Sequence, residues 1–370
     1  MIRTARRQDL DALVAIENAA FQIDRFTRRS FRYLLTQANA ETQVYEDAAG
    51  QVLGYVIVLF HTGTSLARMY SVAVHPEERG RGLGRELIGA AEQMALDHGC
   101  ISLRLEVRRD NAAAIGLYEA MGYRRFGMKK DYYEDHMEAL RYEKRLIPQL
   151  KVDLAKVPYY RQTLDFTCGP SALMMAMKAL DPELELSRHL ELRLWRESTT
   201  IFMTSGHGGC GPYGLAPAAY RMGFDVALYL SERDVMFIDS VRSEEKKEVM
   251  RVVQEDFQAE LAGLPVPIQP HALTVDEMEQ AFRDGAIPVV LISSYRIYQE
   301  KFPHWVVVTG FDERYVYAHD PFIDYDKDKV ALDSINMPIP RKDFEHMARY
   351  GKAAQKAALI LRKRKKRGRR

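Results

Sequence analysis

The sequence predicts two domains that both mix helices and strands: an α/β domain with a mixed sheet, followed by an α+β domain. Its 370 residues exceed what one hydrophobic core usually serves. Apolar residues alternate between helical and strand spacing up to residue 147, and a new pattern begins after Val157 and Pro158. We therefore expect a first domain over residues 1–148, a second domain over residues 152–350 and a basic tail over residues 351–370.

The first domain is expected to fold around one sheet, because strand and helix patterns follow each other in short succession. A glycine-rich turn precedes its longest helix. The expected elements are a strand at 2–6, helices from about residue 9 and at 28–35, strands at 43–45, 52–60 and 67–74, a helix at 84–98, a strand at 102–107, a helix at 111–121 and a strand at 140–146.

The second domain is expected to place helices early and in its middle, and strands late, at 287–292, 304–311 and 315–319. No internal repeat is present, which excludes a solenoid. The composition, 47% hydrophobic and 28% charged residues, is ordinary for a globular protein and does not indicate disorder.

The cysteines and the chain start indicate a cytoplasmic protein. Cys100, Cys168 and Cys210 are too few and too scattered for a disulfide framework, and their spacing predicts no metal site. The first residues lack the apolar core of a signal peptide, and no segment approaches the ~18 apolar residues of a membrane span. We expect no bound metal and no membrane partner.

A basic run closes the chain. Residues 362–370 hold eight basic residues and no acid, and without them 45 basic residues face 51 acidic ones, a net charge of −6. Such a run is either a solvated tail or an arm that attracts RNA, the ribosome or another polyanion.

A candidate phosphate-binding loop follows the strand that ends at Val72, Ala73 and Val74. Its glycines permit backbone N–H groups to point at a ligand, and the helix that follows presents its positive end. A glycine-rich turn is also found in proteins that bind no phosphate. The residues of the loop are Arg79, Gly80, Arg81, Gly82, Leu83, Gly84 and Arg85.

This loop resembles the signature of the GNAT superfamily, Arg/Gln-x-x-Gly-x-Gly/Ala, which Arg79, Gly82 and Gly84 match. Further likeness over residues 105–108, 111–123 and 131–133 is typical of its ribosomal-protein-alanine N-acetyltransferase branch, and it covers almost all of residues 1–147. The resemblance implies that acetyl-CoA binds here. Its acetyl-pantetheine part would lie along Val72 to Val74, its pyrophosphate at Gly80 to Arg85, and its pantetheine arm at Asn111.

Glu106 and Tyr118 are the candidate base and acid. Acetyl transfer to an ammonium needs a base, and the departing thiolate needs an acid. The resemblance implies these roles for the two residues. Glu106 could instead pair with an arginine at a strand end, and Tyr118 could be a core aromatic. The loop over residues 133–139 is shorter than in the ribosomal branch, and residues 21–26 would form the other wall of the acceptor groove, so the acceptor stays open.

Cys168 is the candidate nucleophile of the second domain. It lies at the start of an amphipathic helix, where the helix dipole favours the reactive thiolate. Gln162, six residues earlier, could donate to a developing oxyanion. His304, at the start of an apolar strand, and Asp320, after the next strand, complete a possible triad.

The order Gln, Cys, His, Asp resembles papain-like cysteine peptidases. The local sequence is similar to the family that removes double-glycine leader peptides from bacteriocin precursors, over about residues 155–325. Alternatives are a buried structural cysteine and a core histidine. Cys210 also precedes Gly-Pro but lacks an upstream glutamine, and the rival bases are His207, His271 and His319.

Together these patterns predict an acetyl-CoA-dependent N-acetyltransferase acting on a peptide or protein amine, fused to a cysteine peptidase. Cleavage would expose a new α-amine, which the first domain would acetylate. Two other hypotheses stay open: a catalytically silent, peptide-binding second domain, and a ribosome- or RNA-associated factor.

Overall fold

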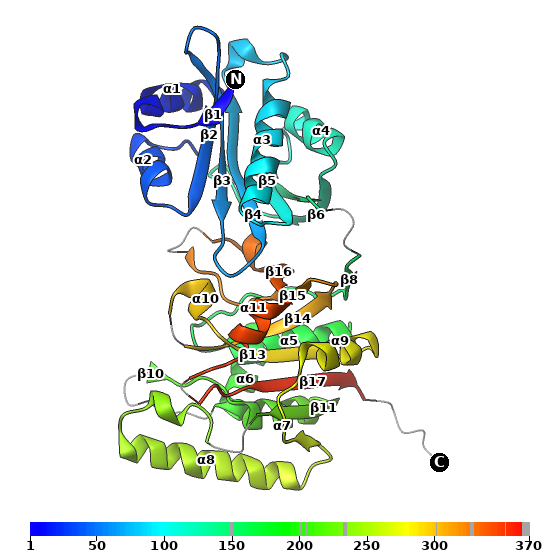
Figure 1. Cartoon of the computed structure of the whole chain (residues 1–370). Helices are drawn as coiled ribbons and strands as arrows, with labels where there is room; N and C mark the ends of the chain where they lie inside the picture. Colours follow the sequence, from blue (N-terminus) through cyan, green and yellow to red (C-terminus); the bar gives the residue numbers. More distant parts are fainter. Residues whose placement is uncertain are drawn as a thin grey trace. The chain divides into compact units, whose positions relative to one another are not determined.

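The computed structural model describes residues 1–147, 151–199, 202–203, 206–231, 235–300, 302–325, 329–351 and 353–364. The chain divides into two compact units, Met1–Gln149 and Leu150–Arg370, and each is considered by itself (Figure 1). The expected boundary near residue 150 lies outside the described residues.

The first unit is built on a seven-stranded sheet in the order β1-β2-β3-β4-β5-β7-β6. Neighbouring strands are antiparallel except β4 and β5, which are parallel. β6 is an element that the sequence analysis missed. The strands are β1 (Ile2–Thr4), β2 (Ala40–Glu46), β3 (Val52–Phe60), β4 (Leu66–Val74), β5 (Ser102–Arg108), β6 (Arg124–Lys129) and β7 (Ala139–Arg145).

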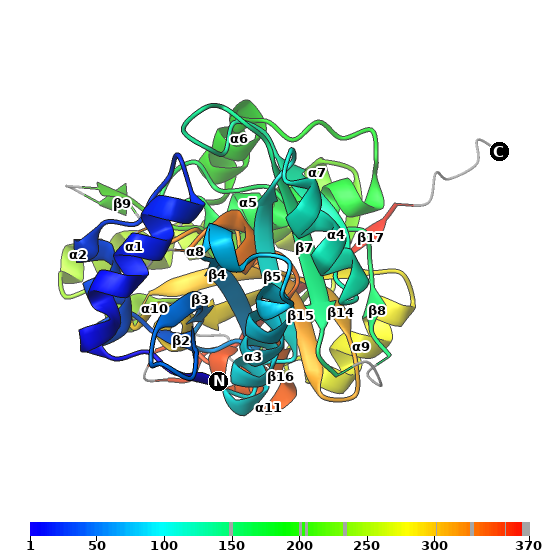
Figure 2. The same cartoon turned by 90° about the horizontal axis from the view of Figure 1, so that it is seen from above.

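Helices cover both faces of this sheet (Figures 1 and 2). α1 (Leu10–Ala20) and α2 (Arg28–Thr36) pack on the face that carries Tyr55 and Ile57. α3 (Leu83–Asp97) packs on the opposite face, with Val56 and Val58, and α4 (Ala112–Ala120) contributes Tyr118 to the same cluster. Successive side chains of β3 point to opposite faces of the sheet, and helices cover both faces. Both faces of β3 are therefore buried, which explains why the strand is apolar throughout.

The second unit contains a larger sheet in the order β12-β11-β17-β13-β14-β15-β16, with β8 paired to β14. α5 (Cys168–Leu180) contacts β13 and β14, so the helix that begins at Cys168 lies on the sheet that carries His304. The strands are β8 (Asp153–Leu154), β11 (Phe224–Leu230), β12 (Ile268–Gln269), β13 (Ile287–Ser293), β14 (Pro303–Phe311), β15 (Tyr315–His319), β16 (Met337–Pro340) and β17 (Ala357–Lys363).

The expected basic tail over residues 351–370 is wrong in its first part. Residues 357–363 form β17, which pairs with β11 on one side and β13 on the other. The apolar run Ala357 to Leu361 is buried, and the exposed basic residues begin only at Arg362. The basic run at residues 362–370 favoured the interpretation as a tail, although an apolar run directly precedes it. Residues 365–370 lie outside the described part of the chain.

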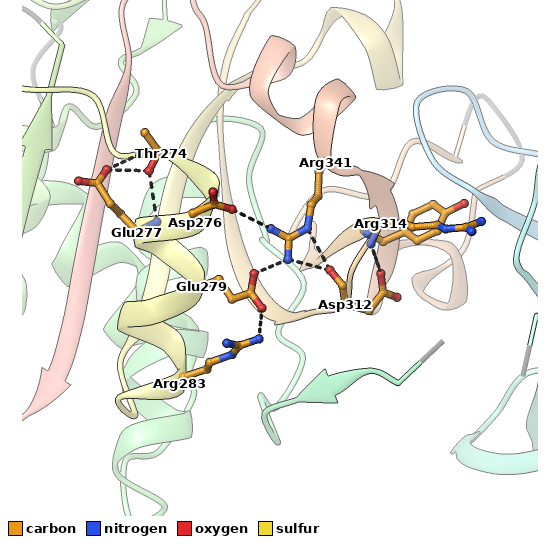
Figure 3. A network of polar contacts seen from close by, with 9 residues as sticks. Thr274, Asp276, Glu277, Glu279, Arg283, Asp312, Arg314 and Arg341 are labelled. Carbon is orange, nitrogen blue, oxygen red and sulfur yellow. Dashed lines mark hydrogen bonds and ion pairs between the residues drawn. The ribbon is translucent and has the colours of Figure 1, made fainter. Parts of the chain in front are cut away.

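Arg341 joins three elements at one side of the second unit (Figure 3). It begins α11 (Arg341–Met347), and its guanidinium donates to the carbonyl of Asp312 at 2.7 and 3.0 Å. It also pairs with Glu279 and, at 3.3 Å, with Asp276 on α9 (Val275–Arg283). This network fixes the turn between β14 and β15 and thereby the strand that precedes Asp320.

None of the described helices is both long and apolar enough to cross a bilayer.

The role of β17 can be tested by substitution. Leu359 is fully buried in this central strand, so Leu359→Ala should lower the free energy of unfolding by about 2–5 kcal/mol. Lys363→Ala, on the same strand with a side chain 64% exposed, should stay within about 0.5 kcal/mol of the wild type. Urea unfolding followed by tryptophan fluorescence reports the second unit, which holds both tryptophans, Trp195 and Trp305. Equal stability of the two variants would contradict the strand assignment.

Candidate active sites

The two central strands of the first sheet separate and leave an opening between them. β4 and β5 pair only over residues 66–69 and 102–105. Beyond that point β4 continues against β3, and β5 continues against β7. Val72, Ala73 and Val74 therefore lie on a strand edge that β5 does not cover. Such an edge can bond to an extended ligand.

The glycine-rich loop joins β4 to α3. Because α3 begins at Leu83, the amides of Leu83 and Gly84 have no partners within the helix, whereas the amide of Arg85 donates to the carbonyl of Gly82 at 3.0 Å. Gly80 and Gly82 adopt φ angles of +80° and +86°, a region that disfavours residues with a Cβ. A Cβ at either position would meet open space, so backbone conformation is the reason for glycine there. The loop thus has the donors and the open surface that a pyrophosphate needs.

The three arginines of this loop differ in their contacts. Arg81 forms an ion pair with Glu78, and Arg79 donates to the carbonyl of Ala20 at 3.4 Å. Arg79, Arg81 and Arg85 are all exposed. A bound anion would compete with Glu78 for Arg81, whereas Arg85 extends from the first turn of α3 itself. These residues fit a polyphosphate group by charge as well as by backbone geometry.

Glu106 lies on β5 beside the opening, with a side chain 6% exposed. The hydroxyl of Tyr132 donates to Oε2 at 2.7 Å, and Nε of Arg141 donates to Oε1 at 3.3 Å. The arginine partner that the sequence left open is therefore present, although it is not at a strand end but opposite Glu106 on β7. An amine could reach the carboxylate by displacing one donor or through one water.

Tyr118 lies on α4 and is 6% exposed, with its ring edge-to-face against Tyr123 at 5.7 Å. Burial raises the pKa of Tyr118, so the hydroxyl holds its proton at neutral pH. Asn111 is the N-cap of α4, and its Oδ1 accepts from the amide of Ala114 at 3.1 Å. Only the Nδ2 group of Asn111 is thus left to contact a ligand.

Two loops meet near Glu106. The amide of Glu134, after β6, lies 3.4 Å from the carboxylate of Asp24, after α1. Tyr133 packs edge-to-face on Tyr132 at 5.0 Å. Burial, and then the charge of Glu106, raise the pKa of Tyr133. The loops that the sequence placed as walls of an acceptor groove therefore lie beside the candidate base.

Cys168 is the first residue of α5 and is 7% exposed. The residue before it, Thr167, is the N-cap, and its hydroxyl lies 2.8 Å from the carbonyl of Leu164. Nε2 of Gln162 donates to the same carbonyl at 2.9 Å. Oε1 of Gln162 is buried and has no hydrogen-bond partner among the described residues. One N–H of this amide is thus engaged in the turn before Cys168, which leaves one for an oxyanion.

His304 and Asp320 lie together in the interior of the second unit. Nε2 of His304 is 2.6 Å from Oδ1 of Asp320, and both side chains are almost fully buried. The other oxygen, Oδ2, accepts from the hydroxyl of Tyr298 at 2.5 Å, and the amide of Phe322 donates to Oδ1 at 2.8 Å. Cys168 is close enough to the imidazole to contribute to raising the pKa of His304. The structure thus brings Cys168, His304 and Asp320 together.

The charges of these three residues are set by competing effects. Burial alone would lower the pKa of His304, but Asp320 and Cys168 outweigh it and raise the pKa to about 10. Burial would raise the pKa of Asp320, but the imidazolium and the Tyr298 hydroxyl lower it. At neutral pH the pair is therefore a buried imidazolium and carboxylate, which is the state that stabilises a neighbouring thiolate.

The rival residues differ from Cys168 and His304 in their surroundings. Burial and the nearby Cys168 raise the pKa of Cys210, which makes it a poor nucleophile. His319 accepts from the amide of Asn336 and bonds to the carbonyl of Val157, so both ring nitrogens are occupied. His271 is half exposed and pairs with Glu277. The side chain of the remaining rival, His207, lies outside the described part.

Sequence reasoning missed the residues that hold these groups. Tyr132 lies in the segment 131–133 that resembles the acetyltransferase branch, but no function was predicted for it. Arg141 lies 35 positions from Glu106 in the sequence. Tyr298 lies on the short helix α10 (Tyr295–Tyr298), which gives no periodic signal. Only the pairing of β5 with β7, and the packing around Asp320, identify these partners.

Comparison with known proteins finds a matching family for each of the two parts of the chain. The model of the Acetyltransferase (GNAT) family matches residues 10–123, and that of the Peptidase_C39 like family matches residues 157–362. A putative ribosomal protein bS18-alanine N-acetyltransferase of Bacillus subtilis is 30% identical over 137 residues, which are 37% of this chain and 89% of that protein.

Two further proteins are similar to a part of this chain. The ribosomal protein bS18-alanine N-acetyltransferase of Salmonella typhimurium is 31% identical over 118 residues, 31% of this chain and 73% of that protein. The solved structure of the ribosomal-protein-S18-alanine N-acetyltransferase of Escherichia coli is 26% identical, covers 40% of this chain and 93% of that chain, and has a TM-score of 0.36.

The charge state of the cysteine site predicts a pH effect. In the variant Asp320→Asn the charge that raises the pKa of His304 is lost, so burial should leave the imidazole neutral at about pH 7. Alkylation of Cys168 by iodoacetamide should then fall at least about tenfold near pH 7. In the wild type the imidazolium persists until the pH approaches about 10, so the charge that favours the thiolate is present at pH 7.

Peptide mapping of the labelled protein measures this effect. Asp333→Asn is the matched control, because Asp333 is also buried but caps a short helix through the amide of Val330 at 2.9 Å. It should label like the wild type. Unchanged labelling of Cys168 in Asp320→Asn would refute the ion-pair assignment.

Proposed function

Because the chain belongs to the GNAT acetyltransferase family and to the Peptidase_C39 like family, we propose that it both acetylates a peptide or protein amine and cleaves peptides. The first unit is an acyltransferase. The observation that carries the second activity is the buried contact of Cys168, His304 and Asp320, which pairs a thiol with an imidazolium.

Acetyl-CoA, when bound, supplies the acetyl group. The loop from Gly80 to Arg85 would hold its pyrophosphate through the amides at the start of α3 and through Arg79 and Arg85. The uncovered edge of β4 at Val72 to Val74 would bond to the pantetheine arm, together with Nδ2 of Asn111. In this arrangement the donor lies in the opening between β4 and β5, next to Glu106.

Glu106 would take a proton from the acceptor ammonium, and Tyr118 would give one to the departing sulfur. An amine at neutral pH carries a proton and has no free electron pair, so a base must act before attack. At neutral pH the Tyr118 hydroxyl keeps its proton, because burial raises its pKa, so the proton is available to the sulfur as the carbon–sulfur bond breaks. The two residues thus act in opposite directions on the two ends of one reaction.

We infer an N-terminal α-amine as the acceptor class. The relatives from Bacillus and Salmonella are named for an alanine of a ribosomal protein. The loops after α1 and after β6, which meet at Asp24 and Glu134, would bind the first residues of the acceptor. A peptide terminus fits this site better than a bulky folded surface because Glu106 is almost buried.

In the second site the thiolate of Cys168 would attack the carbonyl carbon of a peptide bond. The oxygen would take up the negative charge, toward the free N–H of Gln162. His304 would then protonate the leaving amine, and a water deprotonated by His304 would release the acyl group from sulfur. Asp320 orients the imidazole and stabilises its charged form before and after these proton transfers.

The first test concerns acetyl transfer. Glu106→Gln keeps a side chain that can bond to Tyr132 but cannot accept a proton, so turnover should fall about 10²–10⁴-fold. Acetyl-CoA affinity, measured by calorimetry, should stay close to that of the wild type. Glu46→Gln is the control, because Glu46 also pairs with an arginine, Arg3, but lies on β2, which β3 separates from β4. Wild-type turnover of Glu106→Gln at neutral pH would exclude Glu106 as the base.

The second test concerns cleavage and its coupling to acetylation. A peptide library is incubated with the protein, with and without acetyl-CoA, and the products are analysed by mass spectrometry. We expect cleaved peptides in both cases and acetylated new N-termini only with acetyl-CoA. Cys168→Ala should abolish cleavage but keep acetylation, whereas Cys210→Ala should keep both.

The outcome also separates the alternatives. Acetylation without any cleavage by the wild type would favour a silent, peptide-binding second unit. Cleavage that persists in Cys168→Ala would place the nucleophile elsewhere.

A further inference from the structure

Glu191 is a fully buried carboxylate that the proposed mechanism does not use. It lies on α6 (Arg188–Ser198), and its exposed fraction is 0%. A carboxylate at such a position is stable only when several donors replace the water that it lost. The identity of those donors shows what the residue holds in place.

The donors come from the segment before and at the start of α5. Oε1 of Glu191 accepts from the amide of Thr163 at 2.8 Å, and the hydroxyls of Thr167 and Ser171 lie 2.5 and 3.4 Å from it. Oε2 accepts from the hydroxyls of Tyr160 at 2.8 Å and Thr163 at 2.9 Å. Burial and Glu191 raise the pKa of Tyr160, so this hydroxyl remains a donor. All five donors are neutral groups.

These donors flank the two residues that would meet the substrate carbonyl. Thr163 directly follows Gln162, and Thr167 directly precedes Cys168. The hydroxyl of Thr167 lies near Glu191 and near the carbonyl of Leu164, to which Gln162 donates. The segment from 160 to 167 has no helix or strand of its own, so its shape depends on such contacts. One carboxylate therefore fixes both ends of the turn between Gln162 and Cys168.

We propose that Glu191 is a positioning residue for the oxyanion site of the second unit. It holds the Gln162 amide at a fixed distance from the Cys168 sulfur. This inference rests on the proposed peptidase function. It predicts that loss of Glu191 lowers the rate at which Cys168 attacks a carbonyl, because an oxyanion forms in that reaction. The rate of a reaction of the same thiol in which no oxyanion forms should change much less.

Two reagents separate these cases. With 4-nitrophenyl acetate, the sulfur of Cys168 attacks the acetyl carbonyl, a thioester forms and 4-nitrophenolate leaves, so an oxyanion develops. With iodoacetamide, the sulfur displaces iodide from a saturated carbon, and no oxyanion develops. Both rates are assigned to Cys168 by peptide mapping, and Cys168→Ala gives the background.

In Glu191→Ala the acylation rate should fall at least about tenfold, a part of the 10²–10³ lost with one oxyanion donor, while alkylation changes less than about twofold. Glu191→Gln should recover much of the acylation rate, because its Oε1 can still accept from the amide of Thr163 and the hydroxyls can rotate. Glu197→Ala, on the same helix but partly exposed, is the control and should behave like the wild type.

A double variant tests the route of the effect. If Glu191 acts through Gln162, then Gln162→Ala combined with Glu191→Ala should acylate no more slowly than Gln162→Ala alone. Losses that multiply would overturn the proposal, as would acylation and alkylation that fall in parallel, or acylation that does not change. If Glu191→Ala does not fold by circular dichroism, Thr167→Val removes one donor and should lower acylation severalfold without slowing alkylation.

The result also separates this inference from the proposed function. A wild-type Cys168 that reacts with neither reagent overturns both. A reactive wild type with an unchanged Glu191→Ala overturns only the role of Glu191.

Discussion

Asp320 carries a charge where water does not reach, so each of its oxygens must be paired within the protein. Those pairings bring together parts of the second unit that are distant in sequence: His304 on β14, Tyr298 on α10 and the amide of Phe322. The same carboxylate keeps His304 charged against the cost of burial. Removal of the carboxyl group would leave three donors without an acceptor. The electrostatic requirement of one residue therefore determines the geometry and the chemistry of this site together.

In the first unit, the corresponding constraint is a limit on backbone pairing. β4 and β5 can bond only near their starts, because the bulge on β4 beside Ile57 directs its second half away from β5. The gap exposes backbone groups at Val72 to Val74 and places Glu106 on the opposite side. A full ladder between the two strands would be more stable as a sheet but would close the opening. The fold thus keeps unpaired backbone for the ligand to bond to.

The sequence was a good guide to groups whose role depends on local order, and a poor guide to their partners. The loop from Arg79 to Arg85 and the helix start at Cys168 could be predicted because a strand, a turn and a helix follow one another directly. Arg141 and Tyr298 could not, because strand pairing and packing bring them to Glu106 and Asp320. β17 was missed for a related reason: its apolar run is short, and only its place between β11 and β13 shows that it is a central strand.

The chemistry of the two proposed reactions connects the two units. Hydrolysis of a peptide bond by Cys168 produces a carboxylate and a new α-amine, and an α-amine is the acceptor that the first site would take. At neutral pH much of that amine is protonated, since its usual pKa is about 8. A cleaved peptide that is released into water therefore carries a mostly protonated amine, which is not a nucleophile. A base at the acetyltransferase site is required to remove the proton. Glu106 is almost buried and bonded to two donors, and it can accept that proton when the substrate displaces one donor or acts through one water.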